Sequence, residues 1–90
     1  MNSTRRKTLS TLRGKLDDVR SSLEDLITAI EDVSSEEQEC FDNLSENLRG
    51  SERGEKMESA IERLADAISE IEDATGSIEN AVGYIEEAEA

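Results

Sequence analysis

The chain contains no histidine, no tryptophan and no proline, and its 90 residues include a single cysteine, tyrosine and phenylalanine. Without histidine, the commonest acid–base group of enzymes is missing. The lone cysteine, Cys40, excludes an internal disulfide and a cysteine-cluster zinc site, and is typical of a reducing, cytosolic compartment. So few aromatic side chains also exclude an aromatic-rich core. We therefore expect a protein that is not an enzyme, with no catalytic residue, no cofactor and no bound metal.

Long apolar runs are missing as well. No segment approaches the ~18 uninterrupted apolar residues that a membrane span needs. The segment Met1–Leu12 contains Arg5, Arg6 and Lys7, but it lacks the apolar region that follows the basic residues of a secretory signal. The sequence therefore predicts a cytoplasmic protein that does not contact a membrane.

Charge of one sign dominates, because 23 Asp and Glu against 10 Lys and Arg give a net charge of −13. Basic residues gather near the start, where residues 1–20 hold six of them against Asp17 and Asp18. With this net charge and so few aromatic residues, direct binding of nucleic acid is not expected. Two interpretations of the acidic surface stay open. It keeps a heptad protein soluble, or its regularly spaced carboxylates imitate a nucleic-acid backbone on another protein.

Two runs of apolar residues step alternately by three and four, the spacing of heptad positions a and d. The first run is Leu9, Leu12, Leu16, Val19, Leu23, Leu26, Ile30 and Val33. The second run is Ile61, Leu64, Ile68, Ile71, Thr75, Ile78, Val82 and Ile85. Pairing from the outside inward, Leu9 with Ile85 and so on to Val33 with Ile61, keeps every layer in register. The pattern predicts an antiparallel helical hairpin.

We expect residues 1–90 to form one all-α domain of two long helices. The first helix spans about residues 4–43, the turn residues 44–50, and the second helix about residues 51–88. Ser3 or Thr4 is expected to cap the first helix, and Ser51 the second, because serine and threonine accept bonds from free N–H groups.

Flanking charges support the same hairpin. The basic residues at heptad position e of the first helix are expected to face acidic residues of the second. These pairs are Arg6 with Glu86, Arg13 with Glu79, and Arg20 with Glu72. Exposed pairs of this kind contribute only ~0.2–1 kcal/mol each, so they select the register more than they stabilise the fold.

Position g carries small residues along the second helix, with small residues facing them on the first. They are Ala60, Ala67, Ala74, Ala81 and Ala88, with Ser22 and Ala29 opposite. Because small side chains let another helix approach closely, we expect a homodimer packed through this small-residue groove into a four-helix bundle. The alternative is that alanine is simply a good helix former. Gly76 and Gly83 either admit a partner or loosen this end, and the sequence does not separate the two.

The turn carries more chemistry than a connection needs. Phe41, Leu44 and Leu48 form an apolar group, and Arg49 and Arg53 add positive charge. Aromatic residues and arginine are favoured anchors in protein interfaces, so one interpretation is a partner-binding tip. The other is a well-capped turn whose apolar residues seal the end of the bundle.

The same segment resembles a known family. Glu36–Leu44 (EEQECFDNL), Glu46–Leu48 (ENL) and Ser51–Glu55 (SERGE) are similar to small acidic helical proteins from phages, prophages and other mobile elements of Gram-positive bacteria. The likeness covers about residues 36–60 and departs from the family at Ser45, where proline is frequent. No activity transfers with the resemblance. It implies a viral or mobile-element protein inside a bacterial host cell.

Two hypotheses about function follow. The first is an accessory protein that binds a host protein stoichiometrically and inhibits a defence or nucleic-acid enzyme. The second is a scaffolding coiled coil that joins other subunits of a viral or cellular assembly. Either way, the expected partners are a second copy of the chain and an unidentified host or viral protein.

Overall fold

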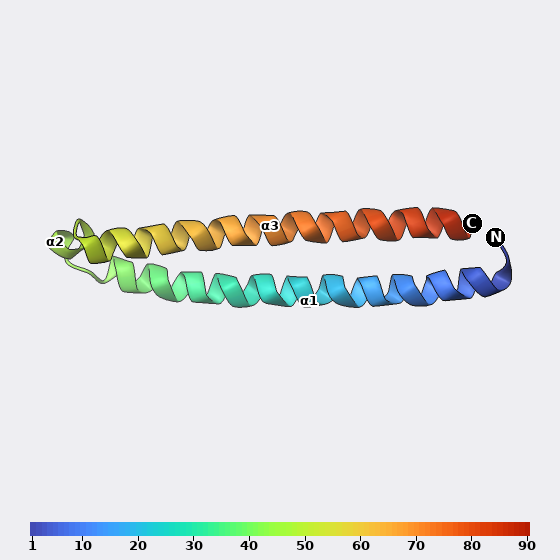
Figure 1. Cartoon of the computed structure of the whole chain (residues 1–90). Coiled ribbons are helices and arrows are strands. Elements are labelled where there is room, and N and C mark those ends of the chain that lie inside the picture. Colours follow the sequence, from blue (N-terminus) through green and yellow to red (C-terminus); the bar gives the residue numbers. More distant parts are fainter.

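The computed structural model describes residues 1–90 as a rod of two long antiparallel helices joined at one end by a short one (Figure 1). Helix α1 spans Ser3–Asp42, α2 spans Glu46–Arg49 and α3 spans Glu52–Glu89. The rod measures 69 × 15 × 13 Å, and both termini lie at the end opposite α2. The all-α hairpin predicted from the heptads is confirmed. None of the helices is long and apolar enough to cross a membrane.

The helix caps differ in detail from the expectation. The N-cap of α1 is Asn2, whose side chain accepts a hydrogen bond from the Arg5 N–H at 2.8 Å. The prediction of Ser3 or Thr4 as the cap was therefore wrong, and the cap lies one or two residues earlier. Asparagine caps at least as well as serine or threonine, and it lets the helix begin earlier. Ser51 is the N-cap of α3 as predicted, but its hydroxyl makes no capping bond.

The connection, predicted as a plain turn over residues 44–50, contains the helical turn α2. Ser45 caps this turn by accepting a hydrogen bond from the Leu48 N–H at 3.4 Å. The Arg49 guanidinium reaches back across the turn and donates to the Asp42 carbonyl oxygen at 2.6 Å. These bonds satisfy backbone groups at the end of α1 and the start of α2, which would otherwise lack partners.

Gly54, in the first turn of α3, is the one buried residue of the chain. A Cβ at this position would lie 2.6 Å from the Leu48 carbonyl oxygen and closer still to Arg49. The backbone of α2 therefore packs directly on α3, which is possible only where α3 has no side chain. The Ser51 hydroxyl donates to the same Leu48 carbonyl, which holds α2 in this position.

The seam between α1 and α3 is made of part-buried residues that step by three and four along each helix. On α1 they include Leu9, Arg13, Leu16, Arg20, Leu23, Ile27, Ile30, Ser34, Glu37 and Phe41. On α3 they include Met57, Ile61, Leu64, Ile68, Ile71, Thr75, Ile78, Val82, Ile85 and Glu89. Counted inward, the two sets match one to one, which places Leu16 level with Val82 and Ile27 level with Ile71.

The register therefore differs from the predicted one. The burial pattern sets Leu9 level with Glu89, whereas the heptads predicted Ile85. The difference of four residues is about one helical turn, or ~6 Å. At the tip, the close contact of α2 with Gly54 fixes where α2 lies against the start of α3, a contact that the heptads do not include.

The ion pairs also differ from the predicted ones, by seven residues along α3. Arg13 pairs with Glu86 at 3.3 Å instead of Glu79, and Arg20 pairs with Glu79 at 3.6 Å instead of Glu72. The predicted pair of Arg6 with Glu86 does not form. Each observed pair lies one heptad further along α3 than the sequence predicted.

The structure also corrects which side of α1 faces α3. Leu12, Val19, Leu26 and Val33, predicted inside the seam, are 45%, 48%, 52% and 53% exposed. Their places in the seam are taken by the residues one position later, such as Ile27 and Ser34. We call these four exposed residues the exposed stripe. With it outside, no hydrophobic residue of the chain is buried.

Candidate interaction surfaces

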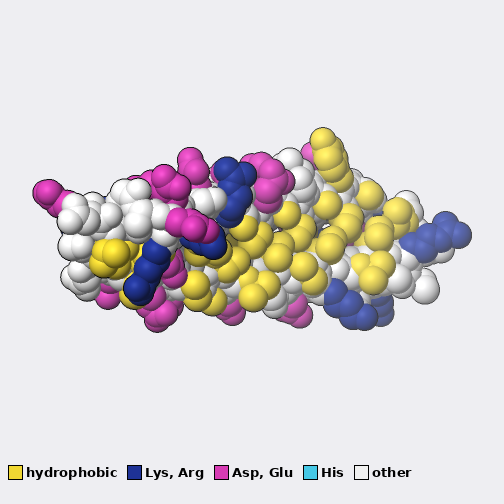
Figure 2. Space-filling model, turned by 60° about the vertical axis from the view of Figure 1, so that its left-hand side comes forward, with side chains coloured by type: hydrophobic (Ala, Val, Ile, Leu, Met, Phe, Trp, Pro, Cys, Tyr) yellow, Lys and Arg dark blue, Asp and Glu magenta, His cyan; other side chains and the backbone are white.

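The exposed stripe follows heptad position d along α1. Its members recur every seven residues, so they line one side of the helix over about 32 Å, from Leu12 to Val33. Figure 2 shows a face of the rod on which hydrophobic side chains form a continuous band, with acidic and basic side chains along its margins. This row of large, half-exposed apolar side chains is a candidate interaction surface.

The small-residue groove lies on the same face as the exposed stripe. Arg13 and Arg20 at position e of α1 meet Glu86 and Glu79 at position e of α3, so both e sides lie together. Positions d and g of α1 and position g of α3 therefore share the opposite side. Of the predicted groove residues, Ala67 and Ala81 are part-buried, and the others are exposed: Ser22, Ala29, Ala60, Ala74 and Ala88. The sequence missed that large apolar residues run beside these small ones.

The tip residues have unequal surroundings. Phe41 and Leu44 are part-buried, and Phe41 borders a shallow hollow with Ile61 on α3. Leu48 is 45% exposed on α2, and Arg49 is exposed beside it. The tip is thus divided into an inner part that packs between the long helices and an outer part that faces solvent.

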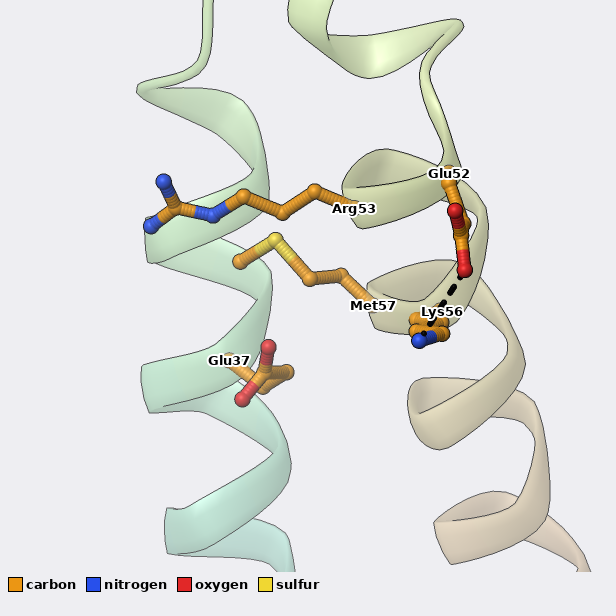
Figure 3. Close-up of a pocket in the computed structure, with 5 residues that line it drawn as sticks. All are labelled: Glu37, Glu52, Arg53, Lys56 and Met57. Carbon is orange, nitrogen blue, oxygen red and sulfur yellow. Dashed lines mark ion pairs between the residues drawn. The ribbon is translucent and has the colours of Figure 1, made fainter.

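A second hollow of about 480 Å³ lies between α1 and α3 near the tip, lined by Glu37, Glu52, Arg53, Lys56 and Met57 (Figure 3). Arg53 and Met57 extend from α3 toward α1, and Glu37 projects into the space from α1. Lys56 pairs with Glu52 at 3.2 Å along α3. Both signs of charge line this open hollow.

The end with the termini is closed by Arg13. Its Nε donates to Glu89 at 3.3 Å and its Nη2 to the other oxygen of Glu89 at 3.1 Å, while Nη1 contacts Glu86. The hydrogen bond to Glu89 raises the pKa of Arg13, with further contributions from the charges of Glu89 and Glu86, against a smaller effect of desolvation. On the side of the rod where position e lies, Arg13 is thus paired with the carboxylates of Glu89 and Glu86. The apolar g side is the one left for a partner.

Three further residues were noted in the sequence. Cys40 is exposed on α1, one heptad beyond Val33. Gly76 and Gly83 are part-buried, yet no atom lies within 4 Å of a Cβ built at either position. The packing of α1 against α3 therefore does not require glycine at these two places.

Two residues that sequence reasoning missed shape these surfaces. Ile27 lies in the seam at position e of α1. The sequence shows that this residue is apolar, but the a and d pattern placed its neighbour at position d in the seam instead. Gly54 anchors the tip, and only the structure shows the close contact that makes it necessary. Comparison of the chain with protein families, with characterised proteins and with solved structures gives no match.

Proposed function

We propose that this chain is a protein-binding module, without enzymatic activity, that acts by stoichiometric contact with a host protein in a phage or mobile-element setting. The observation that carries the proposal is the distribution of apolar side chains. No hydrophobic residue is buried, while the exposed stripe and Leu48 present large apolar groups to solvent. A protein built in this way offers contact surface, and its three open hollows lie on the outside of the rod.

We assign the host contact to the outer part of the tip. Leu48 supplies an apolar anchor on α2, and Arg53 lines the hollow near the tip. The Ser45 cap and the packing of α2 on Gly54 hold this short helix in one place. A preorganised anchor loses little conformational entropy on binding, which favours affinity.

A specific observation favours inhibition of a nucleic-acid or defence enzyme as the effect of binding. The rod is 69 Å long and 15 Å wide and carries a net charge of −13. Regular negative charge along a narrow rod complements a basic groove that normally holds a nucleic acid. The alternative, scaffolding of an assembly, is supported by the same length, which separates the tip from the termini.

The test is capture of partners from a lysate of a Gram-positive host, using the tagged full chain, wild type or with Leu48→Ala or Tyr84→Ala. Tyr84 is 71% exposed near the other end of α3, so Tyr84→Ala removes a larger exposed side chain away from the tip. We expect one host protein in fixed stoichiometry with the wild type and with Tyr84→Ala, and at least about tenfold less with Leu48→Ala.

Other outcomes separate the alternatives. Recovery of structural subunits of a viral particle instead of a host enzyme supports scaffolding. Equal recovery with Leu48→Ala contradicts the assignment of the contact to the tip. Binding that stays unchanged up to ~1 M salt excludes imitation of nucleic-acid charge, because such contacts weaken steeply with salt.

A further inference from the structure

We propose that a second copy of this chain covers the exposed stripe, with the two α1 helices packed side by side and running in opposite directions. The contact uses the middle of the rod, so it leaves both tips free. The host contact is assigned to Leu48 at the tip, so the tests of the two contacts give separate results.

The first support is the amount of exposed surface. The chain exposes 6452 Å², whereas a globular monomer of 9.9 kDa exposes about 5,200 Å². The difference, about 1,200 Å², exceeds the about 800 Å² that each partner of a standard interface buries. A second copy on the stripe brings the exposed area of each chain close to that of an ordinary folded protein.

The second support is the width of the apolar surface on α1. Position a of α1 is apolar and faces α3, and position d is apolar and exposed. The apolar surface of α1 is therefore wider than the part that α3 covers. A single partner helix covers two columns of side chains, whereas a helix inside a four-helix bundle buries three. The alanines of α3 beside the stripe leave room for the second α1 to approach.

The spacing of the stripe is compatible with the opposite direction. A twofold axis between Ser22 and Leu23 sets Val19 level with Leu26 of the second copy, and Leu12 level with Val33. All four stripe residues of each copy then meet an apolar partner. The axis makes the contact the same for both copies, as in most homodimers.

The charges beside the stripe favour the same direction. Arg5 continues the stripe at its N-terminal end and Cys40 at the other, with Glu36 and Glu39 next to Cys40. Antiparallel copies therefore bring Arg5 of one chain to Glu36 and Glu39 of the other. Parallel copies set Arg5 against Arg5 and Glu36 against Glu36, which is unfavourable.

The surface is tested by the mass in solution of the full chain, wild type or with Leu26→Asp. We expect a species of twice 9.9 kDa for the wild type, and a dimer dissociation constant at least about 100-fold higher for Leu26→Asp. The control is Ser21→Asp, an exposed position on the side of α1 away from the stripe, which leaves the dimer unchanged. A monomeric wild type, or an equally stable Leu26→Asp dimer, overturns the proposal.

A second measurement leaves the stripe intact, in case Leu26→Asp fails to fold. The Tm of a protein whose stability depends on a second copy rises with concentration. We expect such a rise for the wild type over a roughly hundredfold range of concentration, since no apolar residue is buried in one chain alone. A Tm that does not depend on concentration contradicts the pairing.

Direction is tested with a disulfide. In Arg5→Cys, the added thiol and Cys40 lie about 52 Å apart along α1, so they cannot join within one chain. Antiparallel copies bring position 5 of one chain to Cys40 of the other, and mild oxidation with oxidised glutathione gives a disulfide between positions 5 and 40. Linkage of 40 to 40 or 5 to 5 indicates parallel copies and overturns the proposed direction. Adding Cys40→Ser abolishes the antiparallel product and keeps any 5-to-5 product.

Discussion

Arg13 and Glu89 lie 76 positions apart in the sequence, and their side chains meet through two hydrogen bonds, from Nε at 3.3 Å and from Nη2 at 3.1 Å. The side chain of Glu89 is only 17% exposed. This contact ties the last turn of α3 to the third turn of α1, at the end of the rod that has no covalent connection. It also fixes the observed register, because the predicted register sets Arg13 opposite Glu79.

We expect Arg13→Ala to loosen the end of α3. The last turn then loses its tie to α1, and amide hydrogens near Glu86 and Glu89 exchange faster with solvent. Hydrogen-exchange mass spectrometry measures the effect. Arg6→Ala is the matched control, since Arg6 makes no ion pair. Equal exchange in the two variants means that the contact does not hold the end closed.

We expect Gly54→Ala to destabilise the hairpin by about 1–3 kcal/mol, because the added methyl group collides with the α2 backbone. Chemical denaturation measures the change. Gly50→Ala is the control, since no atom lies within 4 Å of a Cβ at Gly50. Similar free energies of unfolding for the two variants contradict the close packing of α2 on α3.

We expect Gly76→Ala and Gly83→Ala each to stabilise α3 by about 0.5–1 kcal/mol, because alanine loses less backbone entropy in a helix and the space beside each glycine is open. Thermal unfolding followed by circular dichroism detects the gain. A loss of stability instead of a gain indicates that a partner approaches α3 closely at these two positions, the other alternative that the sequence left open.

We expect Phe41→Ala to lower the stability of the hairpin by about 1–2 kcal/mol, less than for a fully buried phenylalanine, because Phe41 is part-buried beside α3. Binding of the host protein should change little at temperatures where the variant is folded. Leu48→Ala, on the outer part of the tip, should give the reverse pattern. The two variants, measured for both unfolding and capture, separate sealing of the bundle end from recognition.

The heptads predicted the two long helices and their antiparallel pairing well, because the spacing of Leu16, Leu23 and Ile30 recurs along α1. The heptads were wrong about which position of α1 lies beside position a in the seam. Leu26, at position d, is more apolar than Arg13 or Ser34, which are at position e. The sequence therefore predicted that position d of α1 lies in the seam, whereas the structure places position e there. The tip was recognised as unusual, but α2 and the contact at Gly54 were not, since four residues carry too little periodicity to indicate a helix.

The sequence by itself determined that this protein is an all-helical rod folded back at its middle, because side-chain spacing along a helix is a local property of the chain. Only the tertiary structure decided how far α3 slides along α1 and which apolar column of α1 stays outside. Those choices depend on contacts between residues distant in sequence, the seating of α2 on Gly54 and the reach of Arg13 to Glu89, which no local pattern contains.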